Sequence, residues 1–317
     1  MPIKVQNDLP VIGILEQENI FVMDEDRAMH QDIRPLRILI LNLMPLKEDT
    51  ELQLLRCLSN SPLQLDITFM AVATHQGKHT SMSHINKFYV NFEEIKNEFY
   101  DGMIVTGAPV ELMEYEEVDY WDEITRIFDW SEQHVTSTIY ECWGCQAALY
   151  HFYGIQKHQL PKKTFGVYLH HVHKRRIPLL RGFDDIFMCP HSRHTEVRME
   201  DIVKHPEITV LTESDEAGFL LGMAESGRKI FVQGHPEYDR MTLDEEYKRD
   251  LKKGMDIDLP LNYYPNDDPT ERPELTWRAM SAAFYSNWIN YYIYQVTPFD
   301  MYGAPDFTKA AEKREAD

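Results

Sequence analysis

A β-branched segment runs directly into a helical segment at "VTSTIYECWGCQAALYHFY", residues 135–153. Val, Ile and Thr favour a strand, and the sequence that follows suits a helix. The chain must therefore turn sharply at Cys142, and Gly144 leaves room for close packing of the helix behind the turn. Junctions of this kind are typical of proteins in which parallel strands alternate with helices. This stretch predicts an α/β fold.

The rest of the chain continues this alternation. Apolar, strand-like segments lie at residues 37–45, 63–72 and 101–106, and amphipathic helical segments lie at 47–60 and 118–133. From about residue 183, four short strands follow with hairpin-like connections, at residues 183–190, 208–214, 218–225 and 229–236. We therefore predict a doubly wound, mixed and mainly parallel sheet with flanking helices.

The last third of the chain contains two predicted helices and a long loop. Thr242 and Glu245 have the spacing of a capping box, which predicts a short helix over residues 241–254. Residues 255–273 are rich in Pro, Asn and Asp and predict a loop. Residues 274–294 form a strongly apolar late helix, whose aromatic residues we interpret as core or as a face for a homodimer.

Charge and cysteine content narrow the range of partners. The chain has 32 Lys plus Arg against 52 Asp plus Glu, a formal net charge of −20. Such a charge repels phosphate backbones and anionic membrane surfaces, so neither nucleic acid nor a membrane is an expected partner. The four cysteines are too few and too irregularly spaced for a disulfide framework, and we expect a reduced, cytoplasmic protein.

Cys142 is the candidate nucleophile. The N-terminus of a helix lowers the pKa of a thiol there, and the backbone N–H of Trp143 would point toward an oxyanion formed on an attacked carbonyl. Cys145 lies nearly one turn into the helix, where it packs against the sheet. A redox dithiol and an inert buried cysteine remain alternatives, but no second Cys-x-x-Cys pair completes a zinc site.

A histidine that could serve Cys142 occurs at "FVQGHPEYD", where a predicted strand ends. His235 at this strand end can act as general base for a thiol, and Glu237 two residues later can orient the ring and stabilise the imidazolium. Cys142, His235 and Glu237 together form a candidate catalytic triad.

The motifs around these residues resemble those of known enzymes. "CWG" and "HPE" are similar to the cysteine and histidine motifs of the class I glutamine amidotransferase fold, although Tyr140 replaces the glycine usual two residues before the nucleophile. A longer set of segments resembles the homoserine O-acyltransferase family of methionine biosynthesis: "NLMPLKEDTELQLLRCLSNSPLQL", "TGAPVE", "YECWGCQAALYHFYGI", "PHSRHTEV" and "GHPEYD". Residues 35–297 are then the catalytic domain, between an N-terminal segment 1–34 that packs on it and a charged tail 298–317.

This resemblance implies a reaction and its substrates. An acyl group would move from acyl-CoA, a co-substrate, to the hydroxyl of L-homoserine through an acyl-thioester on the cysteine, with no permanently bound cofactor. The substrate contacts would fall on Lys163, Ser192 and Arg249. A glutamine amidotransferase or γ-glutamyl hydrolase is the less favoured hypothesis for the enzyme, because no acceptor domain follows the core.

Glu111 bears on the choice of acyl group. In the family that the chain resembles, a glycine at this position goes with succinyl-CoA and a glutamate with acetyl-CoA. A carboxylate in a partly desolvated pocket also repels the distal carboxylate of a succinyl group. We therefore predict a homoserine O-acetyltransferase that uses acetyl-CoA, with the O-succinyltransferase as the alternative. Glu111 could otherwise belong to the acidic run 111–117 and face water.

Other candidates are weaker. Lys47 follows the first strand of the core, at the edge where open α/β sheets bind ligands. The basic run 170–176 could lie near the phosphates of CoA. Cys189 and the histidines at 170–173, 191 and 194 match no established zinc spacing, so we predict no metal site.

Overall fold

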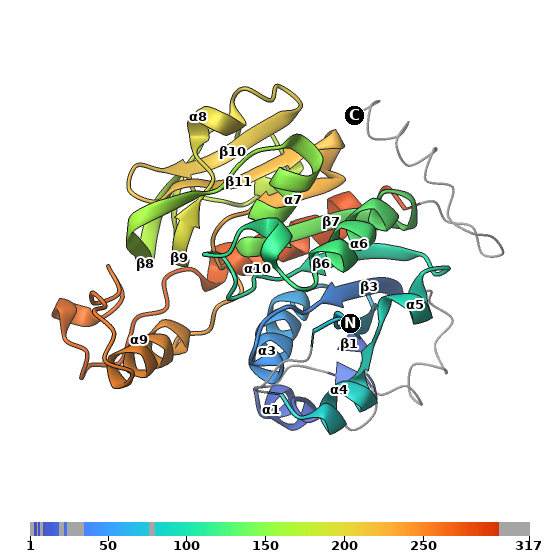
Figure 1. Cartoon of the computed structure of the whole chain (residues 1–317), viewed down its shortest axis with the longest axis horizontal. Coiled ribbons are helices and arrows are strands. Elements are labelled where there is room, and N and C mark those ends of the chain that lie inside the picture. Colours follow the sequence, from blue (N-terminus) through green and yellow to red (C-terminus); the bar gives the residue numbers. More distant parts are fainter. Residues whose placement is uncertain are drawn as a thin grey trace.

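One mixed sheet forms the centre of the protein, with helices on both of its faces (Figure 1). The computed structural model describes residues 3–4, 6, 9–18, 22–23, 35–75 and 80–297. The strands are β1 Ile3–Lys4, β2 Val22–Met23, β3 Leu36–Leu41, β4 Leu65–Met70, β5 Tyr89–Val90, β6 Tyr100–Val105, β7 Val135–Glu141, β8 His158–Val172, β9 Ile186–Glu196, β10 Ile208–Ser214, β11 Gly218–Ala224 and β12 Lys229–Val232.

The helices alternate with these strands in the first half of the chain. The α-helices are α1 Ile12–Gln17, α3 Lys47–Leu58, α4 Met82–Phe88, α5 Phe92–Ile95, α6 Trp121–His134, α7 Trp143–Tyr153, α8 Met199–Ile202, α9 Thr242–Lys252 and α10 Arg278–Asn287. Shorter turns are the 3₁₀ segments η1 Tyr115–Glu117, η2 Pro178–Leu180, η3 Glu225–Gly227 and η4 Pro265–Asp267, and the π-helical segment η5 Trp288–Tyr294. Among the described residues, no helix is both long and apolar enough to span a bilayer.

The sheet has a parallel half and an antiparallel half. Over the described residues its strand order is β2-β1-β4-β3-β6-β7-β12-β11-β10-β8-β9, and β5 pairs with β4. Pairing is parallel from β2 to β12 and antiparallel from β12 to β9. The predicted doubly wound, mixed and mainly parallel architecture is confirmed.

Alternation along the strands creates two hydrophobic cores. Successive residues of a strand point to opposite faces, so in β3 Ile38 and Ile40 pack with α3, α10 and η5, whereas Leu39 and Leu41 pack with α6 and α7. All four side chains are fully buried. Both faces of β3 are therefore covered, which explains its continuous apolar sequence.

Two details of the sequence prediction were wrong. The antiparallel half begins at β8 and not near residue 183; the polar and charged residues of β8 hide its strand pattern. Thr242 is not the N-cap of a capping box with Glu245, because α9 begins after Met241 and the Thr242 hydroxyl accepts a hydrogen bond from the N–H of Asp239 at 3.1 Å.

The ends of the chain lie partly outside the described residues. In the N-terminal segment, β1 pairs with β4, and Leu9, Val11 and Leu15 are buried against the same core as α3. The tail 298–317 is outside the described part, and the predicted division into three regions stays a prediction. In the late helix Trp277, Phe284 and Trp288 are core residues.

Candidate active site

Cys142 occupies the sharp turn between β7 and α7. It is the N-cap of α7 with φ 49° and ψ −114°, a conformation that L-residues rarely adopt. Gly144 makes the turn possible: a Cβ there would lie 2.7 Å from the carbonyl oxygen of Thr106 and 2.9 Å from that of Val105, at the end of β6. The predicted junction is therefore held tightly against the neighbouring strand.

Two backbone segments border the Cys142 thiol. Gly107, which lies just after β6, packs closely against Cys142. A Cβ on Gly107 would lie 3.1 Å from the Cβ and 3.5 Å from the Sγ of Cys142. Trp143 is the first residue of α7, where backbone N–H groups have no intrahelical acceptor, and its ring is completely buried. An oxyanion next to Sγ would thus meet the N-terminus of α7.

His235 and Glu237 complete a buried thiol–imidazole–carboxylate arrangement. His235 Nδ1 is 2.7 Å from Glu237 Oε1, and both residues are buried. Burial alone would lower the pKa of His235, but the charges of Cys142 and Glu237 and hydrogen bonds to both raise this pKa well above its ordinary value. The ring of Tyr238 stacks on that of His235 with centroids 4.0 Å apart. The imidazole is therefore fixed and disposed to hold a proton.

A second buried acid lies behind the triad. Glu141 accepts a hydrogen bond from the Tyr285 hydroxyl at 2.6 Å, and burial together with the charge of Glu237 raises its pKa well above the ordinary value. This environment favours the neutral form of the Glu141 carboxyl group. Glu141 was not predicted as a site residue, because in the sequence only its position next to Cys142 points to such a role.

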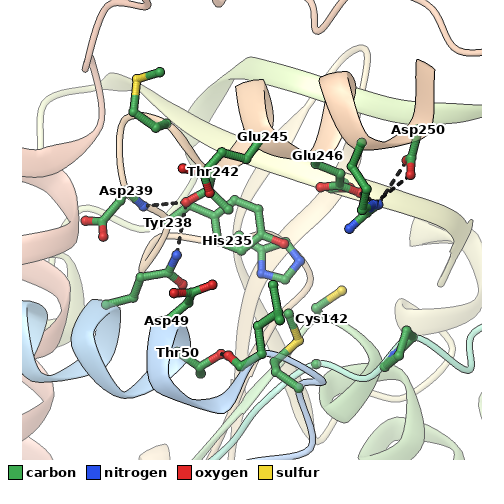
Figure 2. A pocket seen from close by; sticks show the side chains of 18 of the residues that line it. Asp49, Thr50, Cys142, His235, Tyr238, Asp239, Thr242, Glu245, Glu246 and Asp250 are labelled. Carbon is green, nitrogen blue, oxygen red and sulfur yellow. Dashed lines mark hydrogen bonds and ion pairs between the residues drawn. The ribbon is translucent and has the colours of Figure 1, made fainter. Parts of the chain in front are cut away.

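A cavity of about 1210 Å³ opens above the thiol. Figure 2 shows Cys142, His235 and Tyr238 in this cavity, with Glu245, Glu246 and Asp250 of α9 along its wall. The other predicted site residues that line it are Glu111, Lys163, Ser192 and Arg249. The fold therefore brings residues from six parts of the chain to one space.

Glu111 turns into this cavity and away from the acidic run that follows it. Its Oε2 accepts hydrogen bonds from the backbone N–H groups of His194 and Thr195, at 2.8 and 3.2 Å, and from the Thr195 hydroxyl at 3.1 Å. Glu114, Glu116 and Glu117 are exposed. The alternative that Glu111 merely faces water is therefore wrong.

Lys163, Ser192 and Arg249 meet at one carboxylate, that of Glu246. Glu246 Oε1 lies 2.6 Å from Lys163 Nζ, accepts from Ser192 Oγ at 2.7 Å, and lies 3.5 Å from Arg249 Nη2. Arg249 also donates two hydrogen bonds to Asp250, from Nε at 2.7 Å and from Nη2 at 2.9 Å. The three predicted contacts are thus one cluster, and Glu246 is a member that the sequence did not reveal.

Lys47 follows the first core strand as predicted, but its side chain does not line the cavity. It begins α3, but its ammonium group donates to the backbone carbonyls of Asn42 and Met44 and lies over the Tyr89 ring. Burial lowers its pKa to about 8, against the opposing charge of Glu51. Within the described part of the chain, neither Lys47 nor any residue of the basic run 170–176 is among those that line the cavity.

His170 of β8 and His191 of β9 form a buried chain with Arg193. His170 Nδ1 donates to the carbonyl of Tyr168 at 2.9 Å, His191 Nε2 lies 3.1 Å from His170 Nε2, and Arg193 Nε donates to His191 Nδ1 at 3.4 Å. The direction of each hydrogen bond requires both rings to be neutral. Nowhere in the described residues do three His, Cys, Asp or Glu side chains gather in a way that could hold a metal ion.

Cys145 has no access to the cavity. It is completely buried, and burial together with the charge of Cys142 raises its pKa well above the ordinary value. All four cysteines are free thiols. A raised thiol pKa disfavours the thiolate that dithiol chemistry needs.

The cysteine elbow, its histidine and the mixed sheet define a class of protein. The fold is that of the class I glutamine amidotransferases: it is similar to a glutamine amidotransferase from Thermotoga maritima (TM-score 0.53, 13% identity, covering 81% of this chain and 98% of that one). A second, from Methylobacillus flagellatus, has a TM-score of 0.50 at 12% identity, covering 82% of this chain and 95% of that one. At such identities the similarity concerns the fold alone.

Sequence relatives are more specific. The family model described as homoserine O-succinyltransferase matches residues 2–299, and the chain belongs to this family. A homoserine O-acetyltransferase from Agathobacter rectalis is 65% identical, covering 95% of this chain and 97% of that one. One from Lachnoclostridium phytofermentans is 62% identical over 95% of this chain and all of that one, and one from Brevibacillus brevis is 56% identical over 95% and 98%. The predicted family resemblance is confirmed.

Proposed function

We propose that the protein is a homoserine O-acetyltransferase, which moves the acetyl group of acetyl-CoA to the hydroxyl of L-homoserine. Family membership and relatives of that name support the reaction. The observation that favours acetyl over succinyl transfer is the position of Glu111, whose carboxylate is fixed to β9 in the wall of the cavity that contains Cys142. We assign the reaction to methionine biosynthesis in the cytoplasm.

In the first half-reaction Cys142 takes the acetyl group. Its thiolate attacks the thioester carbonyl of acetyl-CoA, and the N–H of Trp143 stabilises the oxyanion of the tetrahedral intermediate. The bond to the CoA sulfur breaks, and His235 supplies the proton that CoA carries away. Because one thioester replaces another, the step is nearly isoenergetic.

In the second half-reaction the acetyl group passes to homoserine. His235 removes the hydroxyl proton as the oxygen attacks the acetyl-thioester, and the Cys142 sulfur leaves with that proton returned to the Cys142–His235 pair. Glu237 stabilises the imidazolium in both halves. Lys163, Ser192 and Arg249 hold the amino-acid end of the acceptor, and release of CoA before homoserine reacts gives ping-pong kinetics.

The fixed carboxylate of Glu111 explains the preference for acetyl. A succinyl group would bring a second negative charge toward Glu111 in a partly desolvated wall, at a cost of about 1–4 kcal/mol at 4 Å. Because the three hydrogen bonds from His194 and Thr195 hold Glu111 in place, it cannot easily turn away. An acetyl group carries no charge to repel.

Donor preference is the decisive measurement. Acetyl-CoA and succinyl-CoA are compared side by side with L-homoserine as acceptor, and kcat/KM should be higher for acetyl-CoA. Incubation with acetyl-CoA alone should add one acetyl group to Cys142, observed by mass spectrometry of the peptide. A preference for succinyl-CoA would establish the alternative donor, and release of ammonia from glutamine without acetylation would overturn acyl transfer altogether.

A further inference from the structure

The cavity above Cys142 is larger than a small amino acid needs. Its volume is about 1210 Å³, whereas pockets of about 300–1,000 Å³ enclose most of a drug-sized molecule. Figure 2 shows Glu246 and Asp250 on one side of His235, and Asp49 and Asp239 on the other. The predicted homoserine contacts belong to the first side, so the second side is available for the donor.

The donor brings several negative charges to this second side. Coenzyme A carries a diphosphate and a 3′-phosphate, and the protein, with a formal net charge of −20, repels such a ligand at a distance. Within the described part of the chain, no residue of the basic run 170–176 lines the cavity. Cations of the cavity itself are therefore needed to bind the phosphate groups.

Most cations that line the cavity are already paired with carboxylates. Among the described residues, Lys163 pairs with Glu246, Arg249 with Asp250, and both Arg56 and Arg278 with Asp239. Arg240 and Arg272 also line the cavity, and neither forms an ion pair with a described residue. Lys253 is unpaired as well, but it directly follows α9, which carries Arg249. On the side away from α9, the charges of Arg240 and Arg272 can therefore attract an anion.

We propose that Arg240 and Arg272 bind the phosphate groups of the acyl-CoA donor, an inference that rests on the proposed function. The two residues are neighbours, because Arg240 Nη1 donates a hydrogen bond at 2.8 Å to the carbonyl of Pro273, which follows Arg272. Nε and Nη2 of Arg240 make no hydrogen bond within the described structure, and the side chain of Arg272 is exposed. Guanidinium groups with unused N–H donors suit phosphate oxygens, which they can bind in pairs.

The backbone around Arg240 is held in place. The carbonyl of Arg240 accepts a hydrogen bond from the Tyr263 hydroxyl, and Trp277 Nε1 donates to the carbonyl of Tyr238 at 2.8 Å. Tyr238 is also the residue whose ring stacks on His235. One fixed segment therefore carries both the catalytic imidazole and a cation for the donor.

The helix α3 completes this side of the cavity. It contributes the apolar side chain of Leu52 and the polar side chains of Thr50 and Gln53 to the lining. Gln53 Nε2 donates to the Thr242 hydroxyl at 3.0 Å, which joins α3 to the segment that carries Arg240. Such a mixed wall suits a pantetheine arm, which carries both methyl and amide groups.

Two donors separate phosphate binding from a purely structural role. Acetyl-CoA and acetyl-pantetheine share the thioester and the arm, but acetyl-pantetheine lacks the nucleotide and all of the phosphate groups. With L-homoserine as acceptor, Arg240→Gln and Arg272→Gln should each lower kcat/KM for acetyl-CoA about 10- to 100-fold, mainly through KM, because charge-assisted hydrogen bonds are lost. The kcat/KM for acetyl-pantetheine should stay at the wild-type value.

Matched variants control for folding and for charge. Arg126→Gln removes an exposed arginine that pairs with Glu93 outside the cavity, and it should leave kcat/KM unchanged for both donors. Arg240→Lys keeps the positive charge and should keep more of the activity with acetyl-CoA than Arg240→Gln does. Arg272→Gln gives an independent measurement if Arg240→Gln folds poorly, because the side chain of Arg272 is exposed.

Binding of CoA itself provides a readout that needs no reaction. In calorimetric titrations with CoA, the Kd should rise about 10- to 100-fold in Arg272→Gln and stay at the wild-type value in Arg126→Gln. Equal losses of kcat/KM with both donors, or an unchanged kcat/KM for acetyl-CoA in both arginine variants, would overturn the phosphate site. Failure of either donor to acetylate Cys142 in the wild-type protein, while CoA binding still weakens in Arg272→Gln, would overturn the proposed function and leave the phosphate site standing.

Discussion

Single residues show how the sequence produces the candidate site. The positive φ of Cys142 is unfavourable for an L-residue, and the structure maintains it because α7 begins there and Gly144 lets the helix contact the end of β6. The same turn exposes Sγ to the cavity and directs the first N–H groups of α7 beside it. The strain at Cys142 and the reactivity proposed for its thiol therefore have one structural cause.

Replacing Glu111 should change the donor. Glu111→Gly removes the fixed carboxylate, so the kcat/KM ratio of succinyl-CoA to acetyl-CoA should rise at least about tenfold, equivalent to about 1.4 kcal/mol. Glu114→Gly is the matched control, because Glu114 is an exposed acid of the same segment, and it should leave the ratio unchanged. A Glu111→Gly enzyme with the wild-type donor ratio would refute this account of specificity.

Substitutions of the two neighbouring cysteines should have different effects on acetylation. Cys142→Ser should lower kcat by at least about 10³-fold and abolish acetylation of the peptide, because the thiolate nucleophile is lost. Cys145→Ala should retain acetylation, because Cys145 is buried in the core and takes no part in the reaction. Loss of acetylation in Cys145→Ala, in a variant that unfolds at the same urea concentration as wild type, would mean that both thiols are needed.

At the scale of elements, the sequence predicted the central strands of the parallel half, but it did not predict β1, β2 or β5 of that half or the start of the antiparallel half. The strand β3 is predicted by its nearly continuous apolar sequence, and β4, β6 and β7 are predicted by their apolar and β-branched residues, although each also contains polar residues. The strand β8 carries an exposed polar end and could not be separated from a loop by its pattern. Tertiary pairing with β9 and β10 determines β8, and no local sequence signal reports such pairing.

The same distinction holds for the candidate site. Cys142 and His235 are predictable, because each follows a strand whose end the sequence reveals. Glu246 and the Arg193–His191–His170 chain are not, because their partners come from distant segments: Ser192 and Glu246 are 54 residues apart. The roles of the predicted residues stay predictions until the variants are measured.

The contact of α7 with β6 should be sensitive to one methyl group. Gly144→Ala would place a Cβ 2.7–2.9 Å from two backbone carbonyl oxygens, which cannot move as a side chain can. We expect a loss of about 1–3 kcal/mol in the free energy of unfolding. We also expect a fall in kcat, because the N-terminus of α7 would move away from the position beside Cys142 where the oxyanion forms. Urea unfolding and steady-state kinetics measure the two effects.

A glycine in open space provides the control for that substitution. Gly13 lies within α1, and a Cβ there has no heavy atom within 4 Å. Gly13→Ala should stabilise the protein by up to about 1 kcal/mol, because alanine favours the helix. Equal stability changes in Gly144→Ala and Gly13→Ala would show that the α7–β6 contact is not tight.

At the scale of the whole molecule, the two halves of the sheet have different parts in the proposed reaction. The parallel half and β12 position the triad, while β8, β9 and the helix α9 supply Lys163, Ser192, Arg249 and Glu246. The cavity lies where these two groups meet. In the proposed reaction, acyl transfer and recognition of the acceptor therefore depend on different parts of the fold.

The buried His170 should make the stability of the whole molecule sensitive to acid. Burial lowers its pKa from 6.5 to about 3, so between these values the unfolded chain binds a proton that the folded chain does not. The free energy of unfolding therefore falls as the pH falls through 6.5, and the contribution of His170 levels off below about pH 3. His170→Gln should reduce the loss between pH 6 and pH 5 by about 1 kcal/mol, because one such proton is removed from the balance. Phe187→Leu is the control, because it disturbs the ring that stacks on His170 without removing a titrating group. This variant should keep the wild-type pH dependence of the free energy of unfolding, measured with urea. The same pH dependence in His170→Gln as in wild type would show that His170 is not the acid-sensitive group.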